Sequence, residues 1–129
     1  MKAIDTNVLV RYLVGDDVRQ ATAARRLLEH ESVWLGLTVL LEATWVLESA
    51  YDFPPAAVAE TVELFLGLPN VHVEGPAQVA RALEAQRSGV QFADALHVAC
   101  SMQSAASFAT FDRQLARSCR GLARIDLLA

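Results

Sequence analysis

The chain is predicted to fold as an α/β domain whose mainly parallel sheet is covered by helices on both faces, a three-layer α/β/α sandwich. Short apolar runs of strand length alternate with longer runs of helical periodicity along all 129 residues. This alternation is typical of βαβ units, in which a helix returns the chain to the start of the next parallel strand. Neither a repeat nor a linker interrupts the pattern, so we expect one domain over residues 1–129.

The first half of the chain alternates in this way up to two adjacent prolines. We expect a strand at 2–4, helices over 7–14 and from 16 or 17 to 28, a strand at 32–35 and a helix from Thr38 to about Tyr51. Gly15 ends the first of these helices, because glycine readily adopts the left-handed conformation found at helix ends. Thr38 is of a residue type that caps helices, so we expect it to begin the last of them.

The second half continues the alternation with shorter strands. We expect a helix over 56–66 with Pro55 in its first turn, a strand at 71–73, helices from Pro76 to near Gly89 and over 92–104, a strand at 107–110, a short helix capped by Asp112, and a last strand at 123–126. Proline suits a first helical turn because its missing N–H would have no partner there.

The composition is rich in apolar residues, at 53% hydrophobic with a mean hydropathy of +0.28. No apolar run approaches the roughly 20 residues of a membrane helix, so we expect a large core, a buried partner surface and no membrane. The N-terminus lacks the order of a signal peptide, and two cysteines make no disulfide framework. We therefore expect a cytoplasmic protein.

The net charge of −4 argues against a protein that holds nucleic acid by a general positive field. If the chain handles RNA, a metal ion or a local group of arginines must overcome the repulsion. Ten of the eleven basic residues are arginine, which pairs with phosphate in a bidentate manner. Arg113, Arg117 and Arg120 recur at helical spacing after Asp112, so phosphate contact and a merely solvated helix face both remain open.

Two acidic side chains come directly after predicted strands. Asp5 follows the first strand and Asp112 the fourth. Ligands of parallel α/β sheets bind outside the carboxyl ends of the strands, so we expect both side chains at the same edge. Each also precedes a helix, and capping of that helix is the alternative role.

Two further acids stand in apolar stretches. A capping box that begins at Thr38 would place its acid at Leu41, so Glu42 is not explained as a cap. Asp94 lies in a predicted first turn, where the helix dipole favours a negative charge. For Glu42 a single solvated position is the alternative, and for Asp94 it is this dipole interaction.

Carboxylates that converge repel one another unless a cation compensates them. Oxygen ligands select Mg²⁺ or Mn²⁺ over zinc. Such a site can activate water, polarise a phosphorus centre and stabilise a leaving oxygen.

Four segments together resemble the motifs of the PIN domain family, and within it the VapC-type toxins of bacterial and archaeal toxin–antitoxin pairs. The opening Ile-Asp-Thr-Asn-Val-Leu-Val-Arg-Tyr-Leu at 4–13 is similar to the first motif. Glu42 in its apolar helix resembles the second motif, 92–99 the third, and Thr110-Phe111-Asp112 the fourth. The resemblance covers the whole chain.

This resemblance implies a sheet of four or five strands and Mg²⁺- or Mn²⁺-dependent cleavage of single-stranded RNA. It implies that the catalytic acids are Asp5, Glu42, Asp94 and Asp112, supported by Thr6, Asn7 and Thr110. Asp5 and Asp94 would bind the metal directly, and Glu42 and Asp112 directly or through water. Arg113 and Arg117 are candidate RNA contacts.

The resemblance also implies a homodimer and a small cognate antitoxin that inserts a helix or tail into an apolar groove beside the site. The groove candidates are Leu9, Leu13, Leu41 and Trp45, for which a place in the core is the simpler alternative. The expected outcome is growth arrest by loss of translation-related RNA.

Three other functions are weighed against this one. A Mg²⁺-dependent phosphatase with Asp5 as nucleophile usually needs a second Asp two residues on, where Asn7 stands, and a later lysine, of which there is none after Lys2. A phospho-acceptor receiver domain fails on the same missing lysine. A PIN-like domain that only binds would be indicated by loss of an acid, and all four are present.

Overall fold

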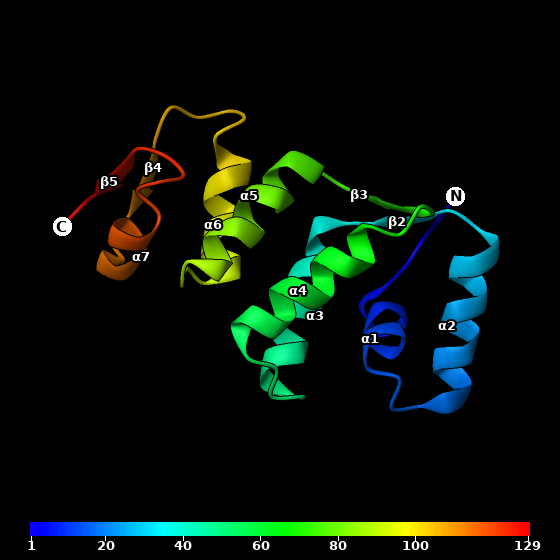
Figure 1. Ribbon diagram of the computed structural model, residues 1–129. Coiled ribbons are helices and arrows are strands. Elements are labelled where there is room, and N and C mark those ends of the chain that lie inside the picture. The colour runs from blue at the N-terminus through cyan, green and yellow to red at the C-terminus, as the bar shows by residue number, and fades with distance from the viewer. The chain divides into compact units, whose positions relative to one another are not determined.

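The computed structural model describes residues 1–129, which form two compact units, 1–74 and 75–129 (Figure 1). Strands alternate with helices in both units, and every strand pairing is parallel. The predicted α/β class is therefore confirmed.

The N-terminal unit contains a three-stranded parallel sheet with the strand order β1-β2-β3. Its elements are β1 (Lys2–Ala3), α1 (Thr6–Val14), α2 (Val18–His30), β2 (Val33–Leu35), α3 (Leu37–Ser49), α4 (Pro55–Leu66) and β3 (Val71–Val73). In the middle strand, Val33 and Leu35 are fully buried, whereas Trp34 between them is 38% exposed. The side chains of β2 thus alternate between the core and the surface, as the pleat of a strand requires.

Two helix ends in this unit can be compared with those expected from the sequence. Gly15 adopts the left-handed conformation at φ 72° and its N–H donates to the Arg11 carbonyl at 3.0 Å, as expected. The expected cap by Thr38 is wrong, since α3 begins one residue earlier. The N–H of Leu37 instead donates to Oε1 of Glu74 at 3.0 Å, so a residue distant in sequence satisfies this helix start.

The C-terminal unit contains a two-stranded parallel sheet in which Phe108 lies opposite Ile125. Its elements are α5 (Pro76–Arg87), α6 (Phe92–Ser101), β4 (Phe108–Thr110), α7 (Arg113–Ser118) and β5 (Ile125–Leu127). Helix α6 ends three residues before the expected position 104, and β5 begins two residues after the expected position 123. Residues 102–104 form turns instead, and their backbone N–H groups bond to carbonyls of the last turn of α6.

The five strands are divided between these two sheets, three in one and two in the other. A periodic sequence predicts that strands are parallel, but it carries no information on which edge each strand joins. No helix of the chain has the length and apolar character needed to cross a membrane.

Candidate active site

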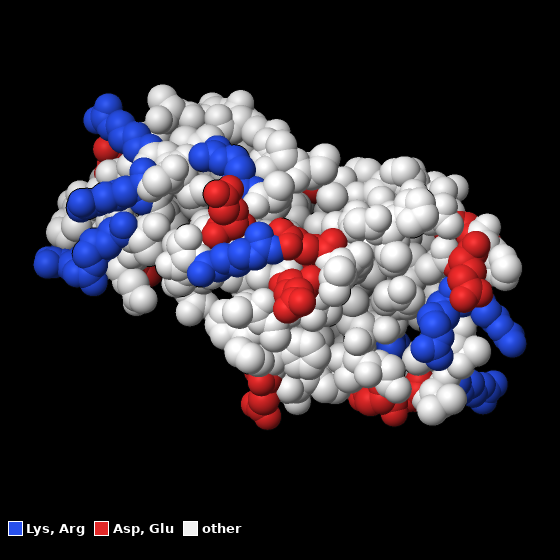
Figure 2. Space-filling view, in the orientation of Figure 1, with Lys and Arg blue, Asp and Glu red and all other residues white.

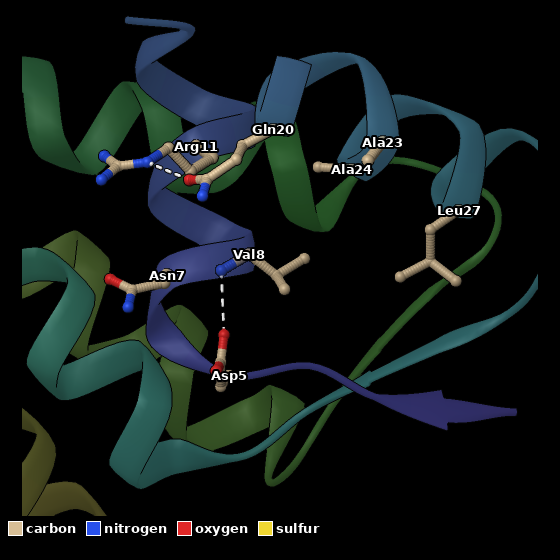
Figure 3. Close-up of a pocket in the computed structure, with 8 residues that line it drawn as sticks. All are labelled: Asp5, Asn7, Val8, Arg11, Gln20, Ala23, Ala24 and Leu27. Atoms are coloured by element: carbon tan, nitrogen blue, oxygen red, sulfur yellow. Dashed lines mark hydrogen bonds between the residues drawn. The ribbon is translucent and has the colours of Figure 1, made fainter. Parts of the chain in front are cut away.

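Asp5 sits at the N-terminus of α1, directly after β1, and is exposed. Its Oδ1 accepts a hydrogen bond from the backbone N–H of Val8 at 2.9 Å, the contact drawn as a dashed line in Figure 3. The capping role is thus real, but it uses only one carboxylate oxygen. Oδ2 has no hydrogen-bond partner and remains available to a cation.

A groove of about 380 Å³ lies beside Asp5, between α1 and α2 (Figure 3). Its lining consists of Asp5, Asn7, Val8, Arg11, Gln20, Ala23, Ala24 and Leu27. Four of the eight lining residues are aliphatic, and the other four supply one carboxylate, one guanidinium and two amides. Of the two supporting residues next to Asp5, Thr6 is half-buried and Asn7 is exposed.

The guanidinium of Arg11 is held in place by residues from two other segments. Its Nε donates to Gln20 Oε1 at 2.7 Å, and its Nη1 donates to the Tyr51 hydroxyl at 3.1 Å and to Asp16 Oδ1 at 3.3 Å. The Tyr51 hydroxyl in turn donates to Asp16 Oδ2 at 2.8 Å. The sequence offered no sign of Tyr51, because it lies 40 residues from Arg11 and acts only through folding.

Glu42 lies on α3 in the same unit as Asp5 and is exposed, with no hydrogen bond or ion pair. The carboxylate of Glu42 is therefore solvated within this unit, and the unfavourable free energy of burying a charge among apolar side chains does not apply to it. Trp45, three residues further along the helix, is 66% exposed. Glu42 and Trp45 thus form a polar and an aromatic position on one accessible face of α3.

The other groove candidates differ from Trp45. Leu9 is only 1% exposed and belongs to the core, so the expectation that it lines a groove is wrong. Leu13 and Leu41 are half-buried. A residue at helical spacing from others can face the core or a groove, and only packing decides between them.

Asp112 caps α7 in the C-terminal unit. Its Oδ1 accepts hydrogen bonds from the N–H groups of Gln114 at 2.9 Å and Leu115 at 3.0 Å. Its own N–H donates to Oγ1 of Thr110 at 3.0 Å, which holds the backbone before the helix in place. Thr110 therefore positions Asp112, and Oδ2 of Asp112 is again left without a hydrogen-bond partner.

Asp94 lies in the first turn of α6 and is half-buried. It makes no cap, because α6 begins after Gln91 without a side-chain cap bond. No hydrogen bond or ion pair compensates its carboxylate. The dipole of α6 favours a negative charge in this first turn, and both carboxylate oxygens of Asp94 remain available to a cation.

Asp94 and Asp112 act on one shared neighbour, the buried thiol of Cys119. Burial raises the pKa of this thiol; a contact from the Ser118 hydroxyl offsets part of that effect, and the negative charges of both aspartates raise the pKa further. Half of the predicted set of four acids is thus brought into the electrostatic range of a single side chain by the fold of this unit.

The predicted gathering of all four acids stays a prediction. In neither unit do three or more His, Cys, Asp or Glu side chains form a group able to hold a metal ion. The donors themselves suit Mg²⁺ or Mn²⁺, because all four are carboxylates and at least one oxygen of each is free of hydrogen bonds.

Arg113 and Arg117 are exposed on the face of α7 that turns away from its buried residues, Leu115 and Ala116. The expectation that Arg120 shares the same helix is wrong, because α7 ends at Ser118. Arg120 lies in the turn that follows and is also exposed.

The family model of the PIN domain matches residues 2–121, and the chain therefore belongs to the PIN domain family. PIN domains are nucleases, typically dependent on a divalent metal. No curated protein is similar enough to the chain to count as a relative. The family resemblance of the sequence is thus confirmed at the level of the PIN domain.

Proposed function

We propose that the chain is a Mg²⁺- or Mn²⁺-dependent endoribonuclease that cuts single-stranded RNA. The observation that carries this proposal is the PIN domain match over residues 2–121, together with the carboxylate oxygens of Asp5, Asp94 and Asp112 that no hydrogen bond occupies. Capping of α7 accounts for Asp112, and the dipole of α6 accounts for an acid in its first turn at Asp94, so the family match is what favours a metal site over these structural roles.

In this proposal the chain's own residues hold and orient the cation. Asp5 and Asp94 bind it directly, while Glu42 and Asp112 bind it directly or through water. The caps fix Oδ1 of Asp5 and of Asp112, so the free oxygens keep a constant direction. When bound, the cation supplies Lewis-acid stabilisation of the charge that develops on the phosphate.

We further propose that the chain is the VapC-type toxin of a toxin–antitoxin pair and forms a homodimer. The groove beside Asp5 supports an antitoxin partner, since aliphatic walls suit an apolar helix or tail, and the carboxylate suits an arginine on it. The exposed Trp45, Leu64 and Phe111 offer apolar surface for a second copy or for the antitoxin.

The test is cleavage of a labelled single-stranded RNA by purified chain in Mg²⁺, in Mn²⁺ and in EDTA. We expect cleavage only with a divalent cation, and a loss of about a hundredfold or more in Asp94→Asn, since loss of a direct ligand costs more than loss of an outer one. Glu84→Gln is the matched control, because Glu84 is an exposed acid of the same unit outside the predicted set.

Cleavage that persists in EDTA, or in Asp94→Asn at the rate of the Glu84→Gln control, would refute the proposal. RNA binding without any cleavage would instead identify the chain as a PIN domain used as a binding module.

A further inference from the structure

Charge is divided unevenly between the two units. Residues 1–74 contain five Lys and Arg against eleven Asp and Glu, a net charge of −6. Residues 75–129 contain six basic and four acidic residues, a net charge of +2. Figure 2 shows basic side chains gathered over the part of the molecule where α7, β4 and β5 lie in Figure 1.

Three basic side chains of the C-terminal unit are uncompensated by any acid. Arg113, Arg117 and Arg120 are exposed and form neither a hydrogen bond nor an ion pair. Arg124 differs from them, since its Nε contacts Asp126 Oδ1 at 3.2 Å. A guanidinium is always charged and has paired donors that match a phosphate, so each of the three is free to bind a phosphate group.

The three arginines begin beside the predicted site. Asp112 caps α7, and Arg113 follows it directly. Arg117 lies one helical turn further, a rise of about 6 Å, and Arg120 extends the series into the next turn of chain. We call Arg113, Arg117 and Arg120 the arginine row.

A hollow of about 280 Å³ lies at the far end of the row, within the same unit. It is lined in part by Ser118, two residues before Arg120, by Gly121 directly after it, and by Arg81, Glu84 and Ser88 of the α5 side. Nη2 of Arg81 donates to the Leu122 carbonyl at 2.9 Å, which leaves its other N–H groups for a ligand. The charge of Arg81 is offset there by that of Glu84, so the uncompensated positive surface consists of the three arginines of the row.

We propose that the arginine row binds the phosphate backbone of single-stranded RNA and supplies most of the affinity of this acidic chain for its substrate. The inference rests on the proposed function in its choice of RNA. A flexible RNA strand has a phosphate at every nucleotide, so it can meet three guanidiniums in succession, whereas an acidic protein segment has no such obligatory repeat. Contacts to phosphate position a strand without reading its sequence.

The experiment measures binding without cleavage. The anisotropy of a fluorescein-labelled oligouridylate is titrated with the chain in EDTA over a series of KCl concentrations. Three phosphate contacts predict a slope of log K against log salt of about −2, at roughly −0.7 for each contact of a single strand. In Arg113→Gln/Arg117→Gln/Arg120→Gln we expect the slope to approach zero and the affinity at low salt to fall about tenfold or more.

Two further triple variants distinguish RNA binding by the arginine row from RNA binding by positive charge anywhere on the protein. Arg19, Arg25 and Arg26 are exposed on α2, and replacing all three by glutamine removes the same charge from the other unit. We expect this control to bind within about twofold of the unmodified chain. The variant Arg113→Lys/Arg117→Lys/Arg120→Lys should keep the salt slope of the unmodified chain, because a point charge suffices for counterion release.

An equal loss of RNA affinity in both triple glutamine variants would overturn the inference, and so would an unchanged affinity in both. Binding of polyglutamate in preference to the oligouridylate would also overturn it and indicate a protein partner. Row-dependent RNA binding by a chain that never cleaves RNA would refute the proposed nuclease and leave the arginine row standing. Metal-dependent cleavage by a chain whose RNA binding does not depend on the arginine row would support the nuclease and refute the role of the row.

Discussion

At the scale of single residues, the roles of helix cap and metal ligand are compatible. Asp5 and Asp112 each use Oδ1 to accept backbone N–H groups and leave Oδ2 free. A cap restrains χ1 and the plane of the carboxylate, so a capping aspartate is already oriented for a second task. Asp94 caps nothing and makes no other polar contact, which separates the two roles within one unit.

Two substitutions at Asp112 should therefore have the same effect on cleavage activity but different effects on stability. Asp112→Ala removes the cap of α7, and we expect the free energy of unfolding to fall by about 1 kcal/mol. Asp112→Asn keeps an oxygen that can cap but loses the charge, so its stability should stay close to that of the unmodified chain. Both variants should lose metal-dependent cleavage. Urea unfolding and the RNA cleavage assay measure the two effects.

Asp94→Asn is the companion variant. We expect no loss of stability, because the Asp94 side chain makes no hydrogen bond that the substitution could break. A drop in its unfolding free energy as large as that of Asp112→Ala would show that Asp94 has a structural role after all.

At the scale of elements, one polar cluster ties three segments of the N-terminal unit together. Arg11 of α1, Asp16 before α2 and Tyr51 after α3 bond to one another. The Tyr51 hydroxyl bond, and then the charge of Arg11, lower the pKa of Asp16 below its ordinary value of 3.8. The bond to Tyr51, together with the charges of Asp16 and Asp17, raises the pKa of Arg11.

This cluster predicts a change of stability in acid. Because the pKa of Asp16 is lower in the folded chain, its stabilising effect is fully present above the unfolded value of 3.8 and is lost as the pH falls through the folded value. Tyr51→Phe removes the main cause, so the variant should lose less stability between about pH 5 and about pH 2 than the unmodified chain. The measurement is the urea midpoint across that range.

Tyr12→Phe is the matched control for this experiment. The Tyr12 ring packs edge-on against Phe65, with centroids 5.4 Å apart, and its hydroxyl makes no hydrogen bond. Tyr12→Phe should keep the full pH dependence. If the stability of Tyr51→Phe depends on pH in the same way as that of Tyr12→Phe, the cluster does not control the loss of stability in acid.

At the scale of the whole molecule, the predicted acids are shared equally between the two units. Asp5 and Glu42 belong to residues 1–74, and Asp94 and Asp112 to residues 75–129. The PIN domain match spans both units. Binding of one cation by all four acids would therefore couple the stability of the two units.

Thermal unfolding with Mn²⁺ tests that coupling. At a tenfold excess of the cation over its dissociation constant, the unmodified chain should gain about 1.4 kcal/mol, seen as a rise in Tm. Each of the variants Asp5→Asn, Glu42→Gln, Asp94→Asn and Asp112→Asn should reduce the rise. If only the variants of the C-terminal unit do so, the metal site belongs to that unit alone.

The sequence by itself determined what depends on neighbours in the chain. The α/β class, strand β3 at 71–73, the end of α1 at Gly15 and the cap of α7 by Asp112 were all predicted. Each follows from periodicity or from the conformational preference of one residue, and these act over a few positions.

Tertiary structure decided what depends on residues far apart in the chain. The start of α3 is satisfied by Glu74, and Arg11 is held by Tyr51. The division of the strands into two sheets, and the common action of Asp94 and Asp112 on Cys119, are of the same kind. Hydrogen bonds, strand pairing and charge act through space, so residues distant in sequence influence one another only after the chain has folded.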